Sequence, residues 1–435
     1  VGAIAALLIL AGLAAALAWQ ATYSSVSLDF LRGRVEASLR ARLPADSKVS
    51  IGSTALSYRG EQGVILRARD VRLDLPGAAT VALAELATIA TPSGLFRGRI
   101  DLSSVTVTGA DIGVVPPVVL REGSRLDIAR IILRAFMAQV FGADDLVRGA
   151  GIREVVVSDA RLRIVERSGG EGPALRISEA SWVPLGSGRS KVWMQAVERN
   201  GSGWDITVER QVGRSGSTAL NIEIEDLPVV ALAPQLADSG QEDAHFDAAV
   251  TLQARMVSRQ DGSFGGLRGV LSTGGGALSI TGKDSMQVAG SAVSFVIGEA
   301  GDRVAIPKGE LRTRTGYVLF DGALDLAQAE RATLLGRIRA GALPTVGTDG
   351  PVRLTGGGVR AYFEFGKSAL QIEDFRLAPA EGTLSAIGQA GFAGPAAGLS
   401  LALSSTRMPA AVVRAFWPPM VADKTRQWFD ANMKA

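Results

Sequence analysis

A regular alternation of apolar and polar residues, beginning at Val49 and continuing through most of the chain, is the feature that most limits its fold. In the segment TALNIEIED, Leu220, Ile222 and Ile224 lie on one side of an extended chain, and polar residues lie on the other. This period of two is typical of β-strands that have one face in water and one face out of it. Gly, Asp and Ser separate such segments at intervals of about 8–12 residues, which favours antiparallel strands joined by turns. The sequence therefore predicts a mainly β protein without the strand–helix alternation of a doubly wound fold.

The apolar sides of these strands are the candidate functional surface. They either pack together in a closed β-sandwich core or stay uncovered and form one continuous apolar surface, and the periodicity does not separate these alternatives. The candidate lining positions are Val71, Leu73, Leu75, Val105, Val107, Leu162, Ile164, Leu220, Ile222, Ile224, Phe320, Leu324, Leu326, Leu399, Leu401 and Leu403.

The first 28 residues contain no charged side chain and predict a transmembrane anchor. As a helix, the stretch VGAIAALLILAGLAAALAW is about 28 Å long, close to the thickness of a hydrocarbon core. Trp19 and Tyr23 lie where aromatic side chains meet the membrane interface. A cleaved signal peptide is the alternative, because Ala14 to Ala18 offer small-x-small cleavage positions. We favour the anchor, since the apolar run is longer than a typical signal core.

Four segments follow from this pattern. Residues 1–28 form the anchor, and residues 29–48 form an amphipathic helix and linker, with Val35 and Leu39 on the apolar side and Pro44 at the end. Residues 49–240 form a first β-segment with a helical insertion near 127–148, and residues 241–435 form a second one that ends in helices. The glycine runs at 274–276 and 356–358 are expected to be β-bulges or tight turns.

The composition argues against catalysis and against nucleic-acid binding. The chain has no cysteine and one histidine, His245, which we expect in a solvent-facing turn, so no metal site is expected. The 46 basic residues are matched by 43 acidic ones and are scattered, which leaves no basic surface for nucleic acid. Neither glycine run continues into the G-K-[ST] of a phosphate-binding loop. The acidic pair Asp144-Asp145 is expected on a solvated surface. We predict no enzyme activity, no catalytic residue and no cofactor.

Three passages of the chain resemble a known family. They are the apolar N-terminal helix with the amphipathic helix after it, the segment from Leu66 to Val115, and the Trp417-Pro418 step followed by Arg426, Trp428 and Phe429. The middle segment contains the run LFRGRI at 95–100, which leads into the strand Val105 to Thr108. With these features the chain resembles the N-terminal portion of the AsmA-like family, especially its YhdP branch of bridge-like lipid transfer proteins, which is related to TamB.

The resemblance implies a single-pass inner-membrane protein whose body lies in the periplasm. It implies an elongated, twisted antiparallel β-sheet with a few short amphipathic helices, curled into an apolar groove that carries phospholipid between inner and outer membranes and supports outer-membrane integrity. The implied partners are phospholipid acyl chains, the inner membrane, and outer-membrane or other envelope proteins. Two alternatives stay open: a scaffold or assembly factor for outer-membrane proteins, and a membrane-tethered β-sandwich receptor or enzyme domain.

Overall fold

The computed structural model describes the strands and a few helical turns, and every structural statement below concerns these residues. They are residues 26–27, 32–40, 46–59, 63–75, 79–90, 104–114, 144, 147–149, 151–165, 171–197, 203–213, 215–228, 244–246, 248–280, 286–313, 316–328, 330–343, 351–364, 367, 369–391, 398–408, 412–413, 427–428 and 431–432. The chain forms two compact units, which are described separately: residues 1–120 with 136–212, and residues 121–135 with 213–435.

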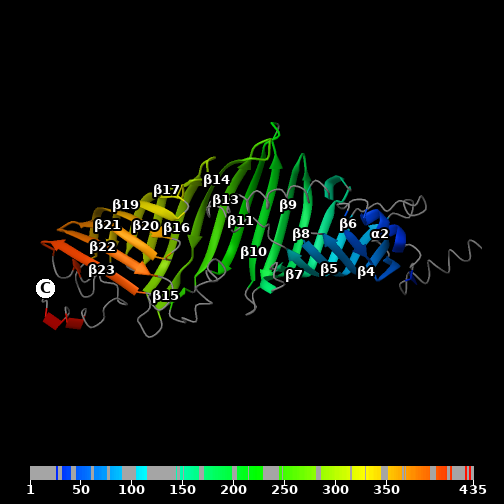
Figure 1. Ribbon diagram of the computed structural model, residues 1–435, viewed down its shortest axis with the longest axis horizontal. Coiled ribbons are helices and arrows are strands. Elements are labelled where there is room, and N and C mark those ends of the chain that lie inside the picture. The colour runs from blue at the N-terminus through cyan, green and yellow to red at the C-terminus, as the bar shows by residue number, and fades with distance from the viewer. Residues whose placement is uncertain are drawn as a thin grey trace, which may run out of the picture. The chain divides into compact units, whose positions relative to one another are not determined.

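Unit 1 is a sheet with one short helix at its beginning. Its elements are β1 (Val26–Ser27), α2 (Arg32–Arg40), β2 (Lys48–Ser50), β3 (Ser53–Arg59), β4 (Gly63–Leu75), β5 (Ala79–Ala90), β6 (Ser104–Val114), β7 (Glu154–Val165), β8 (Glu171–Gly186), β9 (Arg189–Val197) and β10 (Gly203–Val212). From β3 to β10 each strand pairs with the next, and β2 continues the line of β3 beside β4 (Figure 1). Glu36 of α2 holds the helix to the sheet by accepting a 2.9 Å hydrogen bond from the backbone N–H of Ile51.

Unit 2 is a sheet of antiparallel strands (Figure 1). Its elements are β11 (Thr218–Pro228), β12 (Ala244–Phe246), β13 (Ala249–Ser258), β14 (Phe264–Thr273), β15 (Gly276–Ile280), β16 (Met286–Ile297), β17 (Arg303–Thr313), β18 (Tyr317–Asp325), β19 (Arg331–Leu343), β20 (Val352–Glu364), β21 (Ala369–Pro379), β22 (Thr383–Gly391) and β23 (Gly398–Thr406). β12 and β15 pair with each other and prolong β13 and β14, and the remaining strands pair in chain order.

The expectation of a mainly β fold is confirmed. The prediction that all strands pair antiparallel is wrong for one pair, β6 and β7. β6 and β7 run parallel, with Val107 beside Val157 and Ile112 beside Leu162. Parallel neighbours need a crossover connection of a dozen or more residues. Residues 115–153 supply that length between the two strands, whereas the other neighbouring strands of unit 1 follow each other after shorter segments.

Left-handed residues keep the apolar face continuous where a strand carries an extra residue. Asp70, Gly109, Asp159 and Asp226 have φ values of 53°, 63°, 52° and 57°. One extra residue would move every later side chain to the other face, and a bulge absorbs that shift. At Asp226 this is a β-bulge, with a register shift between Ile224 and Leu227. At Asp70, Gly109 and Asp159 there is no register shift, because the paired strands each pass over one residue at the same level. The residues that follow the four positions are apolar and buried: Val71, Ala110, Ala160 and Leu227. Asp and Gly are the residue types that reach this conformation most readily.

The left-handed conformation of Asp159 makes a testable prediction. Asp159→Val should destabilise unit 1 by about 1–2 kcal/mol, because a β-branched residue is strained at positive φ. Asp159→Gly should keep the parent stability, since glycine adopts this φ freely and the Asp159–Arg176 pair, 3.6 Å apart and exposed, contributes little. Urea midpoints of the two variants in the same detergent provide the measurement. Equal midpoints for valine and glycine would contradict the left-handed conformation of Asp159.

The glycine runs meet the expectation of bulges or turns only in part. Gly274 and Gly275 lie in the bend between β14 and β15, and Gly356 adjoins a register shift of β20, whereas Gly357 and Gly358 pair regularly with Leu377 and Arg376. The expectation for His245 is wrong: it lies in the strand β12, paired with Ser279, rather than in a turn. The short alternating segment Ala244–Phe246 is held there by its neighbour β15, a pairing that only the distant segment 276–280 supplies.

Several predictions concern residues outside the described ranges. These are Trp19 and Tyr23, almost all of the predicted anchor, the boundary at 240, and most of the helical insertion near 127–148. Val26 and Ser27, at the end of the predicted anchor, form β1 against β3. In the part of the chain that is described, no helix has the length and apolar character needed to span a membrane.

Candidate functional site

One face of the unit 2 sheet is apolar from its first strand to its last. Residues that pair directly across neighbouring strands lie on the same face, so a row can be followed through the whole sheet. One row is Leu220, Met256, Leu267, Ile297, Val304, Leu324, Leu334, Ala361, Ile372, Gly388 and Leu401. A second row is Ile224, Leu252, Leu271, Val293, Gly309, Phe320, Ile338, Gly357, Leu377, Leu384 and Ser405. We call the face that carries both rows the apolar face.

The apolar face extends a long way across the strands and holds a single polar side chain in these two rows, Ser405 at the last strand. At about 4.8 Å per strand, each row is about 48 Å long. The opposite face carries charged side chains. Asp321 of β18 lies beside Arg337 of β19 and pairs with it at 3.5 Å, and Gly358 of β20 lies between Arg337 and Arg376 of β21.

Unit 1 has an apolar face of the same kind. One of its rows is Val71, Leu83, Ala110, Ala160, Ile177, Ala196 and Trp204, and another is Ala68, Leu86, Val107, Val157, Ala180, Met194 and Ile206. The polar side of the same strands carries Arg69 and Glu85, whose side chains pair at 3.2 Å. Both units therefore have one wet face and one apolar face, as the alternation predicts.

No described strand of unit 2 forms a second layer on the apolar face, because each makes extensive contact only with the strands beside it. Met408, just beyond β23, packs on a small cluster of Leu354, Leu377 and Leu384. Burial is uneven along the face: Leu220 and Met256 are 0% and 1% exposed, whereas Leu401 and Leu403 are 39% and 56% exposed. A closed sandwich is therefore not seen in the described part of unit 2.

The predicted lining residues lie on these apolar faces with one exception. By register, the positions in β4, β6, β7, β11, β18 and β23 all belong to the apolar faces of their units. For Leu75, Ile164 and Leu399 this statement concerns the backbone position only. Leu326 is the exception: it follows the end of β18, and its N–H donates to the carbonyl of Asp302 at 2.7 Å.

The prediction left out strands that complete the two faces. Other strands also place apolar residues in the rows. In unit 1 these are β5, β8, β9 and β10, and in unit 2 they are β13, β14, β16, β17 and β19 to β22. Their signal in the sequence is the same alternation, interrupted by bulges and by glycines such as Gly269 and Gly309.

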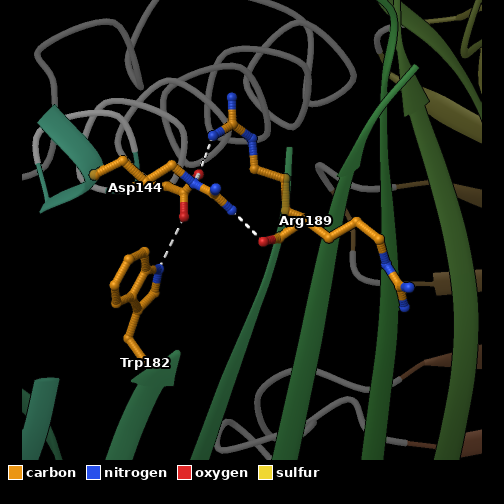
Figure 2. Close-up of polar contacts among 5 residues, drawn as sticks. Asp144, Trp182 and Arg189 are labelled. Carbon is orange, nitrogen blue, oxygen red and sulfur yellow. Dashed lines mark hydrogen bonds and ion pairs between the residues drawn. The ribbon is translucent and has the colours of Figure 1, made fainter. Parts of the chain in front are cut away.

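A polar cluster is set into the apolar face of unit 1 at β8, β9 and β10 (Figure 2). Its centre is Asp144, which is 3% exposed, so the expectation of a solvated surface carboxylate is wrong. The Asp144 carboxylate accepts hydrogen bonds from Trp182 Nε1 at 2.8 Å and from Arg148 Nε at 3.0 Å, and it pairs with Arg210. Arg148 also donates to the backbone carbonyl of Arg189. The cluster therefore ties the helical residues around Asp144 to three strands.

The partners of Asp144 keep its carboxylate ionised. Burial is the largest influence and by itself would raise the pKa of this carboxyl group. Hydrogen bonds from Ser190, Arg210, Trp182 and Arg148 outweigh burial, so the pKa lies below the ordinary 3.8. No feature of the sequence around Asp144 points to these partners, because Trp182 and Arg210 are 38 and 66 residues away.

Comparison of the chain with models of known protein families and with curated proteins gives no match. The described residues also contain no group of three His, Asp or Glu side chains placed to hold a metal ion. The candidate site is therefore defined by the two apolar faces and by the polar cluster at Asp144.

Proposed function

We propose that the chain is a lipid-transfer protein whose apolar faces carry the acyl chains of phospholipids. The main support for the proposal is the two rows of residues that cross the sheet of unit 2. Together these rows contain one polar side chain, Ser405. A sheet that only needed a stable core would cover this face with a second layer, and no described strand of unit 2 does so.

The energetics favour a continuous apolar face for such a ligand. Two acyl chains of about 16 carbons each cost on the order of 25 kcal/mol to expose to water, at ~0.8 kcal/mol per CH₂. A single apolar patch offsets this cost at one place only. A face that stays apolar from strand to strand offsets it at every step, so a lipid can move along it without crossing a polar barrier.

The same proposal includes the groove and the location that the family resemblance implies. Bulges and glycines increase the twist of a sheet and allow it to curl, which would enclose the acyl chains and leave the headgroup in water. We propose that residues 1–28 anchor the chain in the inner membrane with its body in the periplasm. Phospholipid would then pass between inner and outer membranes, with envelope proteins as further partners.

Photo-crosslinking tests the proposal directly. The full chain in mild detergent is mixed with vesicles of phosphatidylethanolamine and phosphatidylglycerol that contain a phosphatidylcholine with a diazirine in one acyl chain. After irradiation we expect labelled residues on the apolar faces only, for example Leu334 and Ile338 but not Leu335 between them. Labels on both faces equally, or no label, would refute lipid carriage. A protein crosslinked stably to the chain in the absence of any lipid label would favour the scaffold alternative instead.

A further inference from the structure

Glycines on the apolar face of unit 2 lie directly opposite large apolar side chains. Gly269 pairs with Phe295, Gly309 with Phe320 and Gly336 with Val359. The same arrangement recurs farther along the sheet, where Gly341 pairs with Leu354, Gly357 with Ile338 and Leu377, and Gly388 with Leu401.

At Gly309 and Gly336 the large side chain opposite occupies the space that a Cβ on the glycine would take. A Cβ on Gly336 would lie 2.7 Å from Cγ1 of Val359, whereas one on Gly269 would lie 2.5 Å from the backbone carbonyl oxygen of Gln253 as well as 2.8 Å from Cζ of Phe295. A Cβ on Gly309 would overlap Cε2 and Cζ of Phe320. The Phe320 ring therefore lies down over its neighbouring strand, and adds about one carbon layer of roughly 3.5–4 Å above the backbone.

The backbone does not require glycine at Gly309 and Gly336, where the atoms nearest to a Cβ belong to side chains. Neither Gly309 nor Gly336 has a positive φ, although such values occur at other glycines of the chain. Glycine within a strand is unfavourable by itself because of its greater entropy loss and its missing side chain. The requirement therefore comes from the opposing side chain, which needs the space above the glycine in order to lie flat.

On the polar face the same glycine requirement is absent at a neighbouring position. Gly358 is next to Gly357 in β20 but belongs to the other face, and a Cβ there would have its nearest neighbour, the carbonyl oxygen of Gly336, at an ordinary 3.5 Å. Gly358 therefore offers a control of the same residue type in the same sheet.

We infer that Gly309 and Gly336 are specificity-determining positions, which keep the apolar face level and so set the cross-section left for an acyl chain above it. The inference rests on the proposed function, because it concerns the same face and the same ligand. A methyl group at Gly309 would lift the Phe320 ring into the space of the acyl chain, and the obstruction would exclude straight chains locally without adding any polar group.

The test compares four chains in the crosslinking experiment with the diazirine phosphatidylcholine: the parent, Gly309→Ala, Phe320→Leu, and the double variant. We expect Gly309→Ala to lower the label in peptides of β17 to β19 at least about tenfold, the effect of one added carbon in a close-fitting apolar site. In the double variant the label should return to the level of Phe320→Leu, since the smaller side chain no longer has to rise. Gly358→Ala should keep the parent label.

The outcomes separate this inference from the proposed function. A parent chain without label would refute the proposed function itself. A labelled parent with unchanged label in Gly309→Ala would refute only the role of the glycines, and so would a double variant that stays as poorly labelled as Gly309→Ala. Should Gly309→Ala fail to fold by circular dichroism, Gly336→Ala with and without Val359→Ala provides the same comparison, because the atom nearest to a Cβ on Gly336 is Cγ1 of Val359, at 2.7 Å.

Discussion

Leu334→Glu should remove lipid label from β18 to β20, whereas Leu335→Glu, at the next residue of the same strand, should leave it at the parent level. Leu334 belongs to a row of the apolar face, paired with Leu324 and Ala361. Leu335 points to the polar face and is 43% exposed. A carboxylate left without water beside an acyl chain costs several kcal/mol, and 1.4 kcal/mol corresponds to tenfold, so we expect a loss of about a hundredfold.

The adjacent position makes this comparison strict. Both variants replace leucine by glutamate in β19, so net charge and strand propensity change equally, and only the face differs. Glu at 335 would face Arg360 across the strand pair. Urea midpoints of both variants check that the fold is kept. Equal loss of label in both variants would show that charge alone, and not the apolar face, controls binding.

The second large effect concerns the polar cluster of unit 1. Asp144→Ala should destabilise the packing of the helical residues on β8 to β10 by roughly 3–5 kcal/mol, because it removes the buried carboxylate that pairs with Arg210 and accepts from Trp182 and Arg148. Hydrogen exchange followed by mass spectrometry provides the measurement. Amides of residues 147–152 and of Arg189 should exchange much faster, whereas those of unit 2 should not change. Unchanged exchange near Arg189 would contradict the tie between Arg148 and that strand.

The same cluster predicts how stability depends on pH. Because the folded pKa of Asp144 lies below 3.8, its contribution is fully present above the ordinary value of the unfolded chain. It is lost as the pH falls through the folded pKa, where the carboxylate binds a proton. The difference in urea midpoint of unit 1 between the parent and Asp144→Asn should therefore be constant near neutral pH and shrink below pH 3.8. A difference that grows on acidification would have the wrong sign.

Much of the candidate site could be predicted from single segments of the sequence. In β11 and β18 the alternation alone assigns Leu220, Ile222 and Phe320 to one face, because side chains of an extended strand point alternately to either side. The prediction fails at Leu326, since alternation carries no signal for where a strand ends. It also fails at Asp144, whose partners come from strands far along the chain.

The local pattern of residues by itself determined that the chain forms strands and that each has one wet and one apolar side. Only the tertiary structure decided that β6 and β7 run parallel, that Asp144 is buried, and that Gly309 lies under Phe320. The physical reason is that alternation is a property of neighbouring residues in one strand. Direction, burial and the pairing of a small residue with a large one depend on which strand lies alongside and in which register.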